Sequence, residues 1–289
     1  MDFISPAVIK RIAAKYGFVF KKGLGQNFLS SQEVLEDIAA AAEISDSGVL
    51  EIGPGFGVLT NELAKRAKKV VALEIDERLI PILNDTLSEY DNVKIINRDV
   101  LKTNLKELIN KEFGNETISV AANLPYYITT PIITALVESS LPLKNIVVMV
   151  QKEVAERLCA EPGSKNYGAI SVMCRYYTTA QLVRIVPSGL FVPPPKVDSA
   201  VLKMVVRNEP PVKVRSEQAF FKTVKAAFSQ RRKTLLNCLS SCTPMSKDTL
   251  SEIMLSVGID PSRRGETLSL DEFARLSDAV FANQPANNT

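Results

Sequence analysis

The chain has 289 residues, 46% of them apolar and 23% charged, which is ordinary for a globular protein with one large domain or two smaller ones. It contains no histidine, and this excludes histidine general bases, Ser–His or Cys–His catalysis and histidine-ligated metals. The four cysteines include no C-x-x-C pair and indicate free thiols in a reducing compartment. With no apolar run of membrane-spanning length and no signal-peptide core, we expect a cytoplasmic protein without a metal.

The net charge of +3 conceals an uneven distribution. Residues 1–30 hold five basic residues and one acidic residue, and residues 212–233 hold seven basic residues and one acidic residue. The rest of the chain is therefore acidic. Two basic segments on an acidic body favour a polyanionic partner, although a solvated surface also produces such runs.

Helical and strand patterns alternate along the first two thirds of the chain. A capping box at Ser30 and Glu33 predicts a helix start, and Thr130 before Pro131 predicts another. We expect strands over 49–52, 70–73, 93–97, 118–122 and 145–150, and further helices over 59–67, 77–90 and 153–158. This alternation predicts a doubly wound, parallel α/β sheet. The β-like runs over 183–186 and 199–206, separated by prolines 193–195, should add an antiparallel edge.

A linker signal at Asn208–Pro211 separates this part from a purely helical remainder. Apolar residues between 220 and 228 repeat on one helix face, and Ser269 with Glu272 forms a second capping box. We expect two domains, 1–207 and 208–289, the second being small and all-α.

A glycine-rich turn, Glu51-x-Gly53-x-Gly55-x-Gly57, follows the first strand of the alternating region. Glycines there let the backbone approach a ligand at a helix N-terminus. Glu74 ends the second strand, where an acid accepts the hydroxyls of a ribose, and Asp99 ends the third, within reach of an adenine amino group. Together these residues predict a nucleoside pocket at the carboxyl ends of the strands.

The pocket alone does not distinguish NAD from S-adenosylmethionine, since both contain adenosine. Two observations favour the latter. The third glycine comes one residue earlier than in the dinucleotide fingerprint G-x-G-x-x-G. In addition, residues 51–62 contain no basic residue that would pair with a pyrophosphate.

Asn123-Leu124-Pro125-Tyr126 follows the fourth strand, at the same edge of the sheet. An amide oxygen and a backbone carbonyl oxygen could accept hydrogen bonds from both N–H groups of an adenine N6. This would free the lone pair of that nitrogen for alkylation. Pro125 fixes the turn, and Tyr126 offers a face for stacking on the base. A sulfonium methyl is already activated, so this chemistry needs no histidine, and positioning supplies most of the rate.

At these positions the sequence resembles the small-subunit ribosomal RNA adenine N6,N6-dimethyltransferases, and the resemblance runs nearly end to end. The motifs that carry it are Gly25-Gln26-Asn27-Phe28-Leu29, Leu50-Glu51-Ile52-Gly53-Pro54-Gly55, Glu74-Ile75-Asp76, Asp99-Val100, Asn123-Leu124-Pro125-Tyr126, Gln151-Lys152-Glu153-Val154, Pro193-Pro194-Pro195-Lys196-Val197-Asp198-Ser199 and Phe228-Ser229-Gln230-Arg231-Arg232-Lys233. The last two favour this family over antibiotic-resistance relatives that act on large-subunit RNA.

The resemblance implies a Rossmann-like class I methyltransferase sheet with a small C-terminal all-α domain, and a role for each matching residue. S-adenosyl-L-methionine would be bound by Asn27, Leu29, Gly53, Gly55, Glu74, Ile75, Asp99, Val100 and Asn123. Asn123 and the Leu124 carbonyl would hold the target N6, with Tyr126 and Phe191 stacked on the two faces of a flipped adenine. For Phe191, packing in the core is an equally good reading.

RNA phosphates would be contacted by the basic segments, at Lys21, Lys22, Lys222, Lys225, Arg231, Arg232 and Lys233. We thus expect a monomeric, cytoplasmic enzyme that dimethylates two adjacent adenines near the 3′ end of small-subunit ribosomal RNA during ribosome biogenesis. One alternative is a ribosome-assembly or nucleic-acid-binding factor that uses the fold without catalysis. A second, an NAD-dependent oxidoreductase, explains neither residues 123–126 nor the basic segments.

Overall fold

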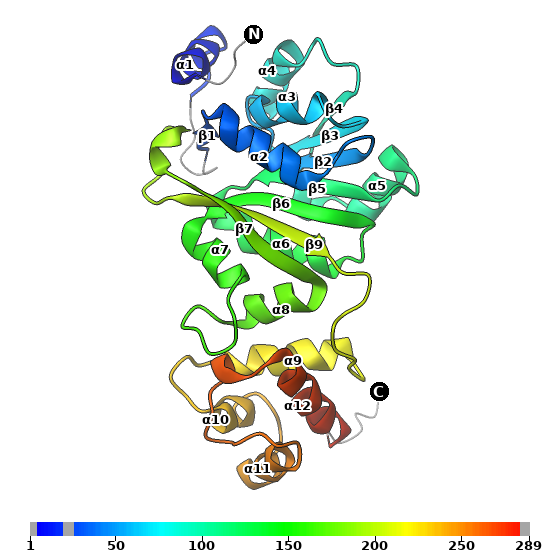
Figure 1. Ribbon diagram of the computed structural model, residues 1–289, viewed down its shortest axis with the longest axis vertical. Coiled ribbons are helices and arrows are strands. Elements are labelled where there is room, and N and C mark those ends of the chain that lie inside the picture. The colour runs from blue at the N-terminus through cyan, green and yellow to red at the C-terminus, as the bar shows by residue number, and fades with distance from the viewer. Residues whose placement is uncertain (1–4, 20–25, 284–289) are drawn as a thin grey trace. The chain divides into compact units, whose positions relative to one another are not determined.

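The computed structural model describes residues 5–19 and 26–283, which form two compact units (Figure 1). The first contains the described chain up to Ala155 together with Thr179–Val206. The second contains Glu156–Thr178 and the described chain from Arg207 on. A single cut after residue 207, as expected from the linker signal, therefore does not separate the two units, because residues 156–178 pack with the C-terminal part.

A seven-stranded sheet forms the centre of the first unit (Figure 1). Its strands are β2(Gly48–Ile52), β3(Lys69–Glu74), β4(Val93–Asn97), β5(Ile118–Asn123), β6(Leu143–Gln151), β7(Thr178–Val186) and β9(Ser199–Val206), in the order β4-β3-β2-β5-β6-β9-β7. The five neighbouring strands β4, β3, β2, β5 and β6 pair in parallel, and β9 pairs with β6 antiparallel. This confirms the predicted α/β fold. Of the two late strands, β9 lies between β6 and β7, and β7 forms the edge of the sheet.

The direction of strand order reverses between β2 and β5, which are direct neighbours. In doubly wound sheets, ligands bind at the carboxyl ends of the strands on either side of such a reversal. The fold thus brings the residues after β2, β3 and β5 to one place.

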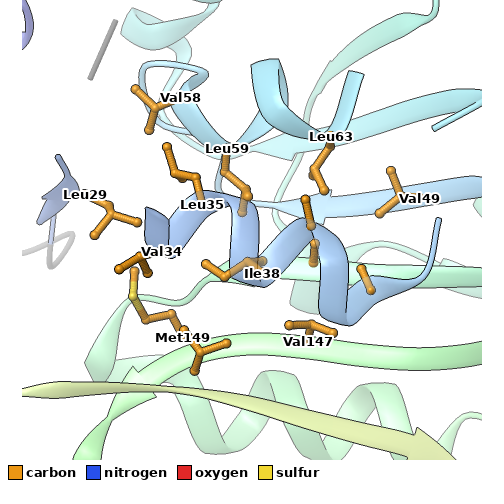
Figure 2. Packing of buried hydrophobic residues seen from close by; sticks show 14 of the residues in the cluster. Leu29, Val34, Leu35, Ile38, Val49, Val58, Leu59, Leu63, Val147 and Met149 are labelled. Atoms are coloured by element: carbon orange, nitrogen blue, oxygen red, sulfur yellow. The ribbon is translucent and has the colours of Figure 1, made fainter. Parts of the chain in front are cut away.

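Helices follow the strands because the central strands are buried and need cover on their faces. They are α2(Gln32–Ala42), α3(Val58–Ala64), α4(Ile80–Thr86), α5(Leu105–Phe113), α6(Thr129–Glu138) and α7(Lys152–Leu158). Figure 2 shows one core cluster, to which α2, α3, β2 and β6 contribute, with Ile38 of α2 on the side of Val147 and Met149.

A short ladder ties the N-terminal segment to the first unit. In it, β1(Phe28–Leu29) pairs with β8(Phe191–Val192). Both the N–H and the Oγ of Ser30 donate to the Leu190 carbonyl oxygen, at 2.8 and 2.9 Å. The predicted cap at Ser30 is therefore wrong, since its hydroxyl is used in this ladder. The helix begins at Gln32 after Ser31, which makes no side-chain cap bond.

The second unit is helical. It comprises α8(Ala169–Tyr177), α9(Glu217–Ala227), α10(Leu235–Ser240), α11(Lys247–Ser256) and α12(Leu270–Ala282). Its core combines α8 residues such as Tyr176 with Phe220 of α9 and Phe273 of α12. The predicted capping box at Ser269 and Glu272 is confirmed, with both reciprocal hydrogen bonds present. Over residues 5–19 and 26–283, no helix is long and apolar enough to span a membrane.

Candidate active site

A pocket of about 890 Å³, its open mouth included, lies at the carboxyl ends of β2, β3 and β5. It is lined by Gln26, Asn27, Phe28, Leu29, Leu35, Ile38, Glu51, Gly53, Pro54, Gly55, Val58, Leu59, Glu74, Ile75, Leu79, Asn123, Leu124, Pro125, Tyr126, Tyr127 and Ile128. All belong to the first unit.

The glycine turn after β2 adopts the backbone that its sequence predicts. Gly53, Gly55 and Gly57 have φ values of +70°, +61° and +83°, a region that side-chain-bearing residues rarely occupy. A Cβ on Gly55 would lie 2.7 Å from the ring of Phe28. The missing side chain therefore lets Phe28 close over the turn and form part of the pocket wall.

Glu74, the last residue of β3, is 5% exposed and lines the pocket. Its Oε2 accepts from the Gly55 N–H at 3.2 Å, and its Oε1 accepts from the Asp76 N–H at 2.8 Å. Burial raises the pKa of Glu74, while these backbone N–H groups oppose the rise. The carboxyl group is thus held in a fixed orientation between the glycine turn and the loop after β3.

Glu51, on β2, is a second acid in the same pocket wall and is almost completely buried. Its Oε2 has no hydrogen-bond partner among the described residues. Burial, with a smaller contribution from the nearby Glu74 charge, raises the pKa of Glu51 to about 8. The sequence places Glu51 in the glycine motif but gives it no separate role. The structure adds it as a buried acid in the wall.

Asn123 ends β5, and the residues after it form the turn predicted from their sequence, continuing into the 3-10 helix η4(Tyr126–Ile128). The Asn123 Nδ2 donates to the Asn27 carbonyl oxygen at 3.1 Å, which orients the amide and leaves Oδ1 as its acceptor end. The hydroxyl groups of Tyr126 and Ser199 lie 2.6 Å apart and hydrogen-bond. This bond fixes the Tyr126 ring at the pocket.

Asp99, Val100 and Phe191 are predicted site residues that the structure does not place in the pocket lining. Asp99 accepts from the Leu101 N–H at 2.9 Å and caps the 3-10 helix η3(Val100–Lys102), and Val100 is buried. Phe191 is 3% exposed and packs in the core cluster with Leu29; stacking of its ring on an adenine stays a prediction.

The structure also adds pocket residues that the sequence did not single out. Phe28 forms part of the pocket wall. The sequence feature that could have indicated this is an aromatic residue inside the motif at 25–29. Gln26 lines the pocket and donates to the Asp76 Oδ2 at 2.9 Å. Tyr127 lines the pocket and is 56% exposed. The sequence feature that could have indicated it is the pair of adjacent tyrosines at 126 and 127.

Five of the predicted RNA-binding residues are exposed in the second unit: Lys222, Lys225, Arg231, Arg232 and Lys233. Lys21 and Lys22 lie outside the described residues. No group of three or more potential metal ligands occurs within the described ranges.

The site combines a glycine turn after β2, a carboxylate at the end of β3 and an Asn-Leu-Pro-Tyr turn at the end of β5. On a parallel sheet to which β9 adds an antiparallel strand, this combination defines a Rossmann-like methyltransferase. Comparison with known proteins agrees. The family model "Ribosomal RNA adenine dimethylase" matches residues 17–280. The chain belongs to this family, which confirms the resemblance seen in the sequence and the enzyme class expected from it.

Curated relatives are similar over nearly their full lengths. The "Ribosomal RNA small subunit methyltransferase A" of Geobacillus sp. (strain WCH70) is 52% identical over 96% of this chain and 98% of its own. The protein of the same name from Bacillus cereus (strain B4264) is 54% identical over 98% and 99%.

Two solved structures share the fold at lower identity. A dimethyladenosine transferase from Plasmodium falciparum has a TM-score of 0.72 and 28% identity, covering 86% of this chain and 95% of its own. The 23S rRNA methyltransferase ErmE has a TM-score of 0.68 and 27% identity, covering 88% and 100%.

Proposed function

We propose that the protein transfers methyl groups from S-adenosyl-L-methionine to N6 of adenines in small-subunit ribosomal RNA. The observation that carries the proposal is the meeting, in one pocket, of a ribose-type carboxylate, Glu74, with the amine-binding turn at Asn123–Tyr126. The relatives at 52–54% identity carry small-subunit names, which favours that RNA as substrate. Dimethylation of two adjacent adenines near its 3′ end, implied by the sequence resemblance, is part of the proposal.

The residues present fit this cofactor. Glu74 offers a carboxylate for ribose hydroxyls, and Gly53 leaves the turn open, since a Cβ there would meet nothing nearer than 4.0 Å. Glu51 supplies a buried acid whose Oε2, without a partner among the described residues, can hydrogen-bond to a polar group of the cofactor. Bound S-adenosylmethionine would contribute a methyl group already activated by its sulfonium.

The chain's own contribution to the reaction is to position and activate the amine. The N6 lone pair of adenine is delocalised into the ring, so the amine is a poor nucleophile. The Asn123 Oδ1 and the Leu124 carbonyl oxygen would accept hydrogen bonds from its two N–H groups. These bonds would shift the nitrogen toward tetrahedral geometry. Asn123 is suited to this because its Nδ2 is already engaged by Asn27. Preorganised acceptors of this kind need no rearrangement during the reaction.

RNA contact would come from the exposed cations of the second unit, Lys222, Lys225, Arg231, Arg232 and Lys233. Lysine and arginine contacts to phosphates add affinity that is independent of sequence and falls with salt. The target adenine would be taken out of its stack and held against Tyr126. Monomeric action in the cytoplasm, with small-subunit RNA or a pre-ribosomal particle as the partner, belongs to the same proposal.

The test is Asn123→Ala, compared with Asn115→Ala in an exposed turn. We expect Asn123→Ala to abolish methyl transfer to small-subunit RNA particles while S-adenosylmethionine still binds in isothermal titration. Asn115→Ala should behave as wild type in both assays. Methylation retained by Asn123→Ala contradicts the assigned role. A wild-type chain that binds RNA but gives no titration heat with S-adenosylmethionine would instead support a binding factor.

A further inference from the structure

Asp76 and Arg78 form an ion pair beside the pocket that the proposed chemistry does not use. Asp76 is buried, whereas Arg78 is partly exposed. The Arg78 Nε donates to Asp76 Oδ1 at 2.8 Å, and its Nη2 donates to Oδ2 at 2.5 Å. This two-pronged geometry is the strong form of an arginine–carboxylate pair. The Arg78 guanidinium accordingly holds the pKa of Asp76 below its ordinary value.

The ion pair contacts two residues near the N-terminus, Val19 and Gln26. The Arg78 Nη1 donates to the Val19 carbonyl oxygen at 3.1 Å, and Asp76 Oδ2 accepts from Gln26 Nε2 at 2.9 Å. Gln26 immediately precedes Asn27, whose carbonyl oxygen orients the Asn123 amide. One ion pair on the loop after β3 thus contacts both Val19 and the residue directly before Asn27.

The same pair reaches the ribose-type carboxylate. The Asp76 N–H donates to Glu74 Oε1 at 2.8 Å. The Asp76 side chain also accepts from the Arg78 N–H at 3.3 Å and so caps the 3-10 helix η2(Glu77–Leu79). The loop geometry that orients Glu74 therefore depends on where the Asp76 carboxylate is held.

A third contact connects Arg78 to the pocket wall. Its guanidinium lies 4.7 Å from the centre of the Phe18 ring, within cation–π range. Phe18 packs edge-on against Phe56 at 5.2 Å, and Phe56 stacks with Phe28 at 4.3 Å between ring centres. Phe28 lines the pocket, so the aromatic column that Arg78 caps ends at the site.

From these contacts we infer that Asp76 and Arg78 are positioning residues for cofactor binding, holding the segment with Asn27 and Phe28 and the carboxylate of Glu74 in register. This inference rests on the proposed function. Neither residue is assigned contact with the cofactor or the adenine. The pair acts on affinity through three groups that line the pocket. Its loss should therefore raise the Kd for S-adenosylmethionine more than it lowers kcat, since the link from the pair to the amine-binding turn runs indirectly through the Asn27 carbonyl oxygen.

The test compares the variants Arg78→Ala, Arg78→Lys and Asp76→Asn with Asp85→Ala as the matched control. Asp85 accepts from Lys15 Nζ and from the Tyr16 hydroxyl, both at 2.6 Å. It therefore holds α1(Pro6–Lys15) to α4 without touching the pocket. Each variant is assayed for S-adenosylmethionine affinity by isothermal titration, for KM and kcat on RNA, and for thermal stability.

We expect Arg78→Ala and Asp76→Asn each to raise the Kd and KM for S-adenosylmethionine about tenfold, with kcat within about threefold of wild type; tenfold corresponds to roughly 1.4 kcal/mol. Arg78→Lys should bind more tightly than Arg78→Ala but less tightly than wild type, because lysine keeps the positive charge but cannot form the bidentate pair. Asp85→Ala should leave Kd unchanged. The double variant should be little worse than either single one, since both remove the same interaction.

Wild-type affinity in folded Arg78→Ala and Asp76→Asn would overturn the inference and reduce the pair to a structural contact. An equal loss in Asp85→Ala would also overturn it, because general attachment of the N-terminal helix would then be responsible. If Arg78→Ala does not fold, Arg78→Lys and Asp76→Asn still decide the question. A wild-type protein that binds no S-adenosylmethionine would refute the proposed function itself.

Discussion

Glu51→Gln should change how the stability of the protein depends on pH. The substitution keeps the shape of a protonated glutamic acid but removes its ionisation. Glu51 is almost completely buried, one of its oxygens is unpartnered, and its pKa is raised by burial to about 8. In the unfolded chain the same group has an ordinary pKa of about 4.5. Ionisation of Glu51 therefore opposes folding.

The sign and size follow from proton linkage. Between pH 4.5 and 8 the folded state keeps the proton that the unfolded state has released, so the free energy of unfolding falls as pH rises. The slope is roughly 1.4 kcal/mol per pH unit for one group. Between pH 5.5 and 8 the wild-type protein should thus lose about 3 kcal/mol relative to Glu51→Gln, and above pH 8 the difference should level off.

Urea unfolding at pH 5.5, 7 and 8.5 measures this difference, with Glu107→Gln, on the exposed face of α5, as the control for removing any glutamate. Glu107→Gln should track wild type at each pH. Parallel pH profiles for wild type and Glu51→Gln would refute the reasoning, because Glu51 would then be ionised in the folded protein or would not be buried.

Three further predictions concern the turn, the sheet and the charged surface. Gly55→Ala should cost about 1–3 kcal/mol of unfolding free energy and weaken S-adenosylmethionine binding, because its Cβ meets Phe28. Gly114→Ala, with φ of +65° but open space, should show only the smaller backbone cost in urea unfolding and normal titration. The pKa of Glu43 is lowered to about 2 by hydrogen bonds from Lys144 and Lys203, so its contribution is present above pH 4.5 and lost as pH falls toward 2. Lys203→Met should reduce that acid-dependent loss by about 1 kcal/mol or less, since Glu43 is half exposed, and unchanged acid unfolding would contradict this. Replacing all three cations of residues 231–233 with glutamine should lower the slope of log affinity against log salt for RNA by roughly 2–3, and an unaltered slope would exclude them as phosphate contacts.

Periodicity and turn chemistry were enough to predict most of the sheet. The predicted strands at 93–97 and 199–206 agree with the observed bounds, because alternating or continuous apolar residues end there at polar turns. The glycine turn was predictable for a related reason, since its positive φ values require glycine. The N-terminal ladder between β1 and β8 was not predicted, because two-residue strands have no measurable periodicity.

The candidate site was predicted best where side chains follow strands directly. Glu74 and Asn123 end β3 and β5 and therefore meet by topology. Glu51 and Arg78 were missed as separate contributors because their significance depends on burial and on partners distant in sequence. Arg78 acquires its role only when Val19 and Phe18 fold against it, while Gln26 donates to its partner Asp76. Phe191 shows the opposite limit, since a residue can match a motif and still pack in the core.

The two compact units are interleaved along the chain, and this restricts how the protein could be divided. Residues 156–178 are synthesised before β9 but pack with helices that follow residue 207. A chain truncated after Val206 would keep all seven strands and expose the apolar face of α8, including Val172 and Tyr176, to water. During translation the methyltransferase unit can close its sheet only when residue 206 has emerged, while α8 waits longer for its partners. Gene fragments cut at the linker are therefore expected to yield aggregation-prone halves, and evolutionary exchange of the helical unit would require two coordinated breaks.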